Sequence, residues 1–262
     1  MRRIRYGIPA IVAGAAMLAL AGCSPAGGST AAPTPSTSVA EPVIESPAAT
    51  EEIRLGEGRD RRGSLTAEDW ATYADHVVVF TVANESRVSP SKKEIERGEG
   101  MVGRTVQVTV SKVLWSAPDA PQKAPRSLTM PAPGWVFNNN EDKAGEVKFG
   151  ISGAPRLEKG HSYIKAIEWT DDPCSSDPNV GTWEGLGAGG TLPYEQGVLG
   201  VGEFEGRVQT LDVAKARFKS DHAPLRQQVV GASTESLVAA LKAAPVRAEV
   251  DPGTRECDMT DR

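Results

Sequence analysis

The most distinctive chemistry in this 262-residue chain belongs to its three cysteines, Cys23, Cys174 and Cys257. A thiolate can be alkylated, can bind a metal ion, or can react with a second thiol. Cys174 and Cys257 do not have the Cys-x-x-Cys spacing of zinc and redox sites. In an exported protein two such thiols usually pair. A Cys174–Cys257 disulfide is therefore predicted, with two unpaired thiols as the alternative.

Cys23 follows a segment with the features of an export signal. Residues 1–7 carry three arginines and no acidic residue, and the thirteen residues 8–20 are mostly apolar. That length is typical of the apolar part of a signal peptide and falls short of the ~20 residues of a membrane-spanning helix. Residues 1–22 are therefore interpreted as a signal peptide.

The motif Leu20-Ala21-Gly22-Cys23 resembles the lipobox of bacterial lipoproteins, and the resemblance covers residues 1–23. It implies cleavage before Cys23 and a thioether-linked diacylglyceryl group on its sulfur. Two acyl chains are enough for stable membrane anchoring. We therefore expect a lipid-anchored protein on the extracytoplasmic face of the cell membrane. The alternative is an ordinary signal peptide with an incidental cysteine.

Residues 23–63 are rich in Pro, Ser, Thr and Ala and are predicted to form a disordered tether. Removal of the three signal-peptide arginines takes the formal net charge from −5 to −8 and leaves no basic block. Phosphate binding requires clustered Lys and Arg, so nucleic acid is excluded as a partner. No basic patch is available to help hold the chain on a membrane, so the lipid is expected to do this alone.

The pattern beyond the tether predicts a mainly β domain over residues 64–232. Thr66 and Asp69 have the spacing of a capping box for one short leading helix. Several short strands follow, including one over 104–115 with a bulge at Ser111-Lys112 that returns its apolar residues to one face. A C-terminal helix is predicted over 233–244 and a polar tail over 245–262. Small barrels and β-sandwiches both fit this series, and we favour a small barrel, which the resemblance described next identifies as OB-like.

Three segments support that choice by resemblance: ADHVVVFTV at 74–82, VTVSKVLW at 108–115 and LEKGHSY at 157–163. They resemble a run found in bacterial extracytoplasmic proteins with OB-fold barrels of the netrin/TIMP-like type. The resemblance covers roughly residues 66–210 and implies a small barrel. TIMP proteins inhibit metalloproteinases through a free N-terminal cysteine, whereas Cys23 is assigned to lipid. Inhibition is therefore not carried over.

Established catalytic and cofactor motifs are not found in the sequence. Its three histidines form no zinc motif, and Gly-x-Ser-x-Gly does not occur. Residues 185–190 read GLGAGG and satisfy Gly-x-Gly-x-x-Gly, but Thr-Leu-Pro follows where a dinucleotide loop would open a helix. No metal and no nucleotide cofactor are therefore expected, and the covalent lipid on Cys23 is the one non-protein group predicted.

The function predicted from these features is a non-catalytic binding or interaction module displayed on a lipid anchor. Trp135, Trp183 and Tyr194 fall in predicted loops and are candidates for stacking on a ligand, and the partner would be a cell-wall polymer or a protein. The alternative is an extracytoplasmic hydrolase that uses loop carboxylates, with Glu184 acting together with Asp171 or Asp177.

Overall fold

The structure is a computed structural model that describes residues 51–58, 60, 62–139, 145–220, 222–250 and 257. All of them belong to one compact unit, Ala49–Arg262. The predicted signal peptide, the lipobox and Cys23 lie outside the described residues, as does most of the predicted tether. Residues 53–56, assigned to that tether from composition, form a strand, so the ordered chain begins earlier than expected.

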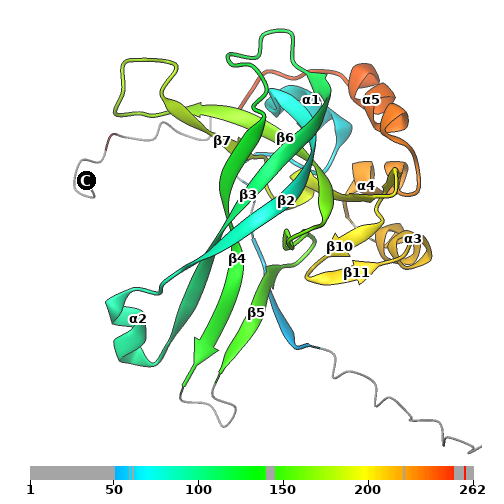
Figure 1. Cartoon of the computed structure of the whole chain (residues 1–262). Coiled ribbons are helices and arrows are strands. Elements are labelled where there is room, and N and C mark those ends of the chain that lie inside the picture. The colour runs from blue at the N-terminus through cyan, green and yellow to red at the C-terminus, as the bar shows by residue number, and fades with distance from the viewer. Residues whose placement is uncertain are drawn as a thin grey trace, which may run out of the picture. The chain divides into compact units, whose positions relative to one another are not determined.

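One large mixed sheet dominates the described part of the chain (Figure 1). Its strands are β1 Ile53–Gly56, β2 His76–Val88, β3 Glu99–Ser116, β4 Ser127–Asn138, β5 Glu146–Ile151, β6 Ser162–Asp171, β7 Gly181–Gly185, β8 Thr191–Glu195 and β9 Val198–Leu199. Their order is β1-β5-β4-β3-β2-β6-β8-β9. β8 pairs with residues 163–165 of β6, and β7 pairs with residues 167–171 of the same strand. β1 pairs with β5 in parallel and the other pairs are antiparallel.

Short helices and a small hairpin complete the structure. The helices are α1 Ala67–Tyr73, α2 Lys92–Arg97, α3 Leu211–Lys219, α4 Pro224–Val229, α5 Thr234–Ala243 and the 3-10 helix η1 Ala188–Gly190. The hairpin pairs β10 Gly202–Phe204 with β11 Arg207–Gln209. Figure 1 shows α2 at the far end of the long β2–β3 hairpin, away from the other helices.

The mainly β prediction is confirmed, but the closed barrel is wrong. The sheet is open: β1 and β9 are its end strands, and no pairing joins them in the part of the chain that the structure describes. The free side of β9 is occupied instead, because Leu199 exchanges backbone hydrogen bonds with Gly231 and Ala232 in the α4–α5 connection. A two-sheet sandwich does not form either, since the second sheet is the two-stranded β10–β11 hairpin.

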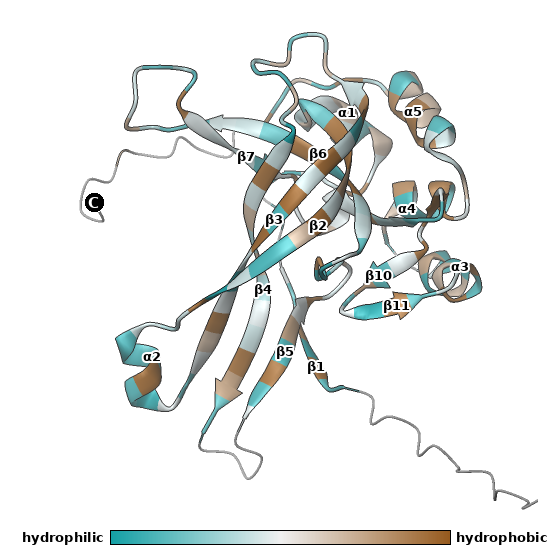
Figure 2. Ribbon diagram, in the orientation of Figure 1, coloured by the Kyte–Doolittle hydropathy of each residue, from teal (hydrophilic) through white to brown (hydrophobic). Residues whose placement is uncertain are grey.

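The two faces of the sheet bury different clusters because side chains alternate along each strand. On one face, which we call the helical face, Val77 and Val79 of β2 pack with Trp70 of α1 and Leu237 of α5. On the other, the cavity face, a second cluster is formed by β2, β3, β4 and β6. Its members include Val78, Phe80, Val106, Val108, Met130, Tyr163 and Ile167. Figure 2 shows apolar residues gathered along the middle of β2, β3 and β6.

Several local predictions are confirmed. Thr66 Oγ1 accepts from the Asp69 backbone N–H at 2.9 Å, and Asp69 Oδ2 accepts from the Thr66 N–H at 2.9 Å, so the capping box begins α1. Residues opposite β2 run from Lys112 directly to Val110, which leaves Ser111 as the predicted bulge. Beyond it the prediction of a single apolar face is wrong. A second register shift skips Leu114, so Trp115 packs against the helical-face core while Val106 and Val108 lie on the cavity face, and Val113 is 45% exposed.

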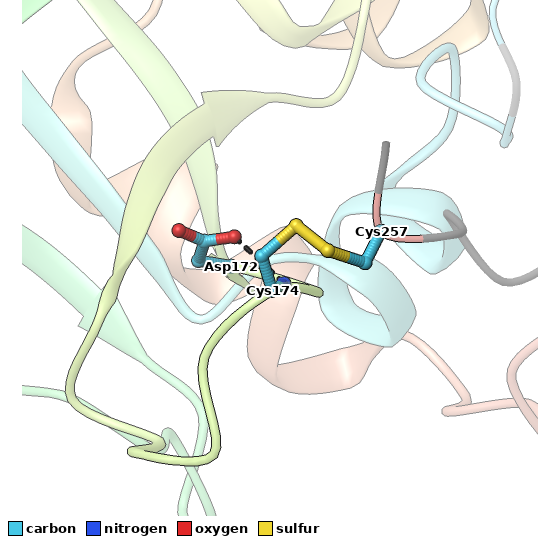
Figure 3. Close-up of a disulfide and its surroundings, with 3 residues drawn as sticks. All are labelled: Asp172, Cys174 and Cys257. Carbon is cyan, nitrogen blue, oxygen red and sulfur yellow. Dashed lines mark hydrogen bonds between the residues drawn. A yellow bond between two sulfur atoms is a disulfide. The ribbon is translucent and has the colours of Figure 1, made fainter. Parts of the chain in front are cut away.

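The predicted disulfide is confirmed: Cys174 and Cys257 are bonded across 83 residues (Figure 3). Cys174 lies between β6 and β7, where its backbone N–H donates to Asp172 Oδ1 at 2.9 Å. A second contact holds the first part of this C-terminal segment, because the guanidinium of Arg247 forms an ion pair with Glu68 Oε1 of α1 at 2.7 Å. The region predicted as a polar tail is therefore attached to the domain at two points.

Candidate functional site

A cavity of about 600 Å³ lies on the cavity face of the sheet. β6, β7 and β8 contribute part of its lining, β4 contributes another part, and the segment after β5 closes one side. Its wall is largely apolar and includes Met130, Pro131, Ile151, Pro155, Leu157 and Ile167. The polar side chains that line it are those of Asp60, Thr129, Lys165, Thr182, Glu184 and Thr191, and the most unusual of these groups is the amine of Lys165.

Lys165 comes from the middle of β6 and lies on the same face as Tyr163 and Ile167, by strand alternation. Its side chain is partly buried, and Nζ donates to Thr191 Oγ1 of β8 at 2.8 Å. Among the residues that the structure describes, no carboxylate lies within 4.0 Å of Nζ. Burial lowers the pKa of Lys165 to about 8, and the negative charge of Asp60 opposes part of that shift.

The carboxylate of Asp60 is engaged by the glycine-rich loop and not by Lys165. Asp60 Oδ1 accepts from the backbone N–H of Ala188 at 2.9 Å, and Oδ2 accepts from the hydroxyl of Ser64. Ser64 Oγ in turn accepts from the N–H of Gly189 at 3.0 Å. Asp60 therefore supports the loop that walls the cavity, and acts on Lys165 at longer range.

The glycines of that loop are explained by close approaches. A Cβ on Gly185 would lie 2.6 Å from Lys165 Nζ, and one on Gly187 would lie 2.1 Å from Asp60 Oδ1. Gly187 also has a φ of +123°, which favours glycine. The segment runs from β7 through η1 into β8, so it lacks the strand–loop–helix context of a dinucleotide site. Its glycines shape the cavity around a lysine.

The three aromatic candidates lie in different places. Trp183 of β7 lines the cavity and packs in a T-shaped pair with Trp169, with ring centroids 5.3 Å apart. Trp135 of β4 lies under the guanidiniums of Arg87 and Arg156, at 4.3 Å and 5.2 Å from their Cζ atoms. Tyr194 packs against the core of the helical face. The structure therefore does not bring the three together, and of them Trp183 lines the cavity.

The carboxylates proposed for a hydrolase are also separated by the sheet register. Glu184 lies opposite Glu168, whereas Asp171 lies opposite Gly181, three positions further along. Asp171 Oδ1 accepts from Trp169 Nε1 at 2.7 Å, and Asp177 Oδ1 accepts from the Asn179 backbone N–H at 2.9 Å in an exposed loop. Burial raises the pKa of Glu168, and the Glu184 carboxylate adds to that shift. Glu184 lines the cavity, whereas Asp171 and Asp177 are not among its lining residues, so the proposed pairs of carboxylates do not meet there.

His76 has a structural arrangement. Its ring is buried, Nδ1 lies 2.8 Å from Ser116 Oγ, and Nε2 lies 2.8 Å from the backbone oxygen of Gln122. A bond to a carbonyl requires the proton on Nε2, so in the neutral ring Nδ1 accepts from the Ser116 hydroxyl. Nδ1 thus contacts the last residue of β3, and Nε2 holds the loop that follows it. Across the residues that the structure describes, no three His, Cys, Asp or Glu side chains form a metal-binding group.

Next to the cavity lies a dense ionic network, which we call the arginine network. It consists of Arg104, Arg156, Glu85, Glu158 and Glu203. Arg104 Nη1 donates to Glu85 Oε2 at 2.7 Å, and Arg156 Nη1 donates to Glu158 Oε1. Arg156 also donates to the backbone oxygens of Phe149 at 2.8 Å and Gly134 at 2.5 Å. Both guanidiniums are buried and have several acceptors each.

Glu203 links this network to the turn before β6. Its carboxylate accepts from the N–H groups of Arg156 and Leu157, both at 3.0 Å, and from the Tyr163 hydroxyl at 2.6 Å. Burial and the Glu203 charge raise the pKa of Tyr163 well above its usual range, so the phenol stays a donor. Leu157 has a φ of 68°, a backbone conformation that costs on the order of 1 kcal/mol for such a residue. The hydrogen bonds from Glu203 hold it there.

Sequence reasoning missed Lys165 and the arginine network. A signal for Lys165 was present, because a lysine interrupts the apolar strand sequence Tyr163-Ile164-Lys165-Ala166-Ile167. The carboxylate partners of Arg104 lie 19 residues away at Glu85 and 54 residues away at Glu158, and nothing in the local pattern connects them.

Comparisons with known proteins leave the site to be interpreted from its own geometry. No protein-family model matches the chain, and no curated protein matches its sequence. Within the described residues, no helix is long and apolar enough to cross a membrane.

Proposed function

We propose that the protein is a lipid-anchored, extracytoplasmic binding protein that holds a small molecule in the cavity beside Lys165 and does not turn it over. The lipobox sequence at Cys23 supports the anchor, and the disulfide supports an oxidising compartment. The proposed location is the outer side of the cell membrane, where a cell-wall polymer or another protein is available as a further partner.

The observation that carries the binding function is the cavity itself. Small-molecule sites are concave, enclose roughly 300–1,000 Å³, and combine an apolar wall with a few convergent polar groups. The cavity on this sheet has a volume of about 600 Å³ and a largely apolar wall, and the Lys165–Thr191 pair is among its few polar groups. It is built mainly on strands, which hold a site more firmly than loops do.

Binding is favoured over hydrolysis because of how the polar groups are used. Asp60 is bonded to the glycine-rich loop, and His76 is bonded through both ring nitrogens. Hydrolysis by acid–base or nucleophilic catalysis needs a nucleophile and a base within hydrogen-bond reach of the same atom. The groups around this cavity support recognition more directly than turnover.

The binding function is tested with the full mature chain carrying Cys23→Ser, purified without lipid and screened by thermal shift against small extracellular metabolites. We expect at least one compound to raise the melting temperature in proportion to its concentration. Addition of a residue-sized block to the cavity wall, as in Ala154→Trp, should abolish that shift. A glycosidase, esterase and peptidase panel is run in parallel. Robust turnover, or no thermal shift across the library, would contradict the proposal.

The anchor is tested separately by feeding cells a labelled fatty acid and isolating the protein. Label should appear on the wild-type product and be lost from the Cys23→Ser variant. An unlabelled wild-type product that retains residues 1–22 would overturn the assignment of the lipid.

A further inference from the structure

We infer that the ligand of this cavity is a monocarboxylate with an apolar body, and that the Lys165 ammonium together with the Thr191 hydroxyl binds its carboxylate. This inference rests on the proposed binding function and specifies the chemical class of the ligand.

The first reason is that Lys165 is a partly buried cation without an anionic partner. Charges removed from water are normally paired, because an unpaired one is strongly destabilising. Within the described residues, the hydrogen bond of Nζ to Thr191 Oγ1 is its one polar contact, and no carboxylate lies within 4.0 Å of Nζ. An ammonium has three N–H donors. A ligand carboxylate would satisfy those that Thr191 does not.

The second reason is the shape of the space around Nζ. Gly185 of β7 faces Lys165, and even one methyl group there would lie 2.6 Å from Nζ and 2.4 Å from Cε. The missing side chain leaves the amine reachable from the cavity. Thr191 Oγ1 accepts from Nζ, so its own hydroxyl hydrogen is available to donate. Two donors on adjacent strands suit the two oxygens of one carboxylate.

The third reason concerns the charge and the body of the ligand. Among the described residues, Lys165 is the one cation that lines the cavity, and the carboxylates of Asp60 and Glu184 also line it, so a second anionic group on the ligand is disfavoured. Most of the remaining wall is apolar and includes Met130, Ile151, Leu157 and the indole of Trp183. A flat or linear hydrocarbon body matches it. Aliphatic and aromatic acids share this chemistry, and separate probes distinguish them.

The experiment measures calorimetric affinities of the full mature chain carrying Cys23→Ser for matched probes. Octanoate is compared with octan-1-ol and octylammonium, and 4-phenylbutyrate with 4-phenylbutan-1-ol. We expect at least one carboxylate to bind more than tenfold tighter than its alcohol, and octylammonium to bind more weakly than either. The acid that binds better identifies an aliphatic or an aromatic body.

Lys165→Met should remove the preference, so that the carboxylate and its alcohol bind within about threefold of each other. Lys92→Met, which alters an exposed lysine on α2, is the matched control and should retain the tenfold preference. Melting temperatures of both variants establish that they are folded.

Equal binding of acid and alcohol to the wild-type chain overturns the inference and leaves the proposed function standing. A preference that persists in Lys165→Met also overturns it. If no probe binds, the inference fails, and the metabolite screen then decides the proposed function independently, because neutral ligands found there would still support it.

Discussion

The arginine network and Lys165 place cations on the same side of the sheet in opposite circumstances. Arg104 and Arg156 are 2% and 0% exposed, and their guanidiniums donate to the carboxylates of Glu85 and Glu158 and to several backbone oxygens. Within the part of the chain that the structure describes, Lys165 Nζ makes one hydrogen bond, to the neutral hydroxyl of Thr191. Buried charges stabilise a fold only when their lost hydration is replaced. The arginine network is therefore expected to stabilise the fold, whereas the burial of Lys165 is expected to destabilise it.

This difference in pairing indicates that Lys165, and not the arginine network, is the candidate for ligand binding. Residues selected for stability alone would replace Lys165 with an apolar side chain, because β6 is otherwise apolar at its centre. Functional sites commonly retain such a destabilising group. Four substitutions test the contrast, and they are taken in order of their expected effect on stability.

Arg156→Met should have the largest effect. It removes the partner of Glu158 and leaves backbone oxygens of Phe149 and Gly134 without their donors. Breaking a buried ion pair on one side costs about 3–5 kcal/mol. Urea unfolding measures the change. Arg54→Met, at an exposed pair with Glu52, is the control and should cost below about 1 kcal/mol. Similar values for the two would show that the network is not structural.

Lys165→Met should stabilise the protein at pH 7 by about 1–3 kcal/mol, because it removes an ammonium whose pKa burial has lowered to about 8. The advantage should depend on pH. Between pH 8 and the ordinary value of 10.5, the unfolded chain holds the Lys165 proton and the folded chain releases it, so wild-type stability rises with pH relative to the variant. Urea unfolding at pH 7, 9 and 10.5 measures this. A variant less stable than wild type would refute the contrast.

Thr191→Val should have a smaller effect. The substitution keeps the shape and removes the acceptor at 2.8 Å from Lys165 Nζ, so about 1 kcal/mol should be lost. In the Lys165→Met background the same change should be close to neutral, because the hydrogen bond no longer exists. Equal losses in the two backgrounds would mean that Thr191 acts through some other contact.

Gly185→Ala should change stability least, by about 0.5 kcal/mol or less. Displacing the flexible end of Lys165 loses the hydrogen bond to Thr191, about 1 kcal/mol, but replacing glycine by alanine within a strand offsets about 0.5–1 kcal/mol of that loss. The ammonium should be displaced from Thr191, and carboxylate affinity should fall at least tenfold. Calorimetry with the probes above reads the affinity and urea unfolding reads the fold. A variant that binds as tightly as wild type would show that Gly185 does not shape the site.

Local features of the fold could be predicted from the sequence, and the closure of the sheet could not. The Thr66–Asp69 capping box and the Ser111 bulge depend on neighbouring residues, and both are confirmed. The Cys174–Cys257 pair followed from counting cysteines in a chain predicted to be exported. An open sheet and a barrel share the same strand alternation. In this chain the sheet stays open where the α4–α5 connection forms hydrogen bonds with β9, and the pattern of residues in the strands does not encode that contact.

The candidate site was predicted less well for the same reason. Trp183 was chosen as an aromatic in a loop, and it lines the cavity as a residue of β7. Trp135 and Tyr194 were chosen by the same criterion and are engaged elsewhere. Exposure in a predicted loop does not reveal which face of a sheet a side chain will occupy. Two further helices, α3 and α4, were also missed, since residues 211–230 give a weak helical pattern.

Gly185 offers a way to test the proposed function genetically. Any glycine codon becomes an alanine codon through one base change, so the mildest lesion available in the gene would fill the space beside the Lys165 amine. On the proposed function, a strain with that allele would make a folded protein impaired in ligand capture. Its phenotype would separate the consequences of losing the ligand from those of losing the protein, which a deletion strain cannot do.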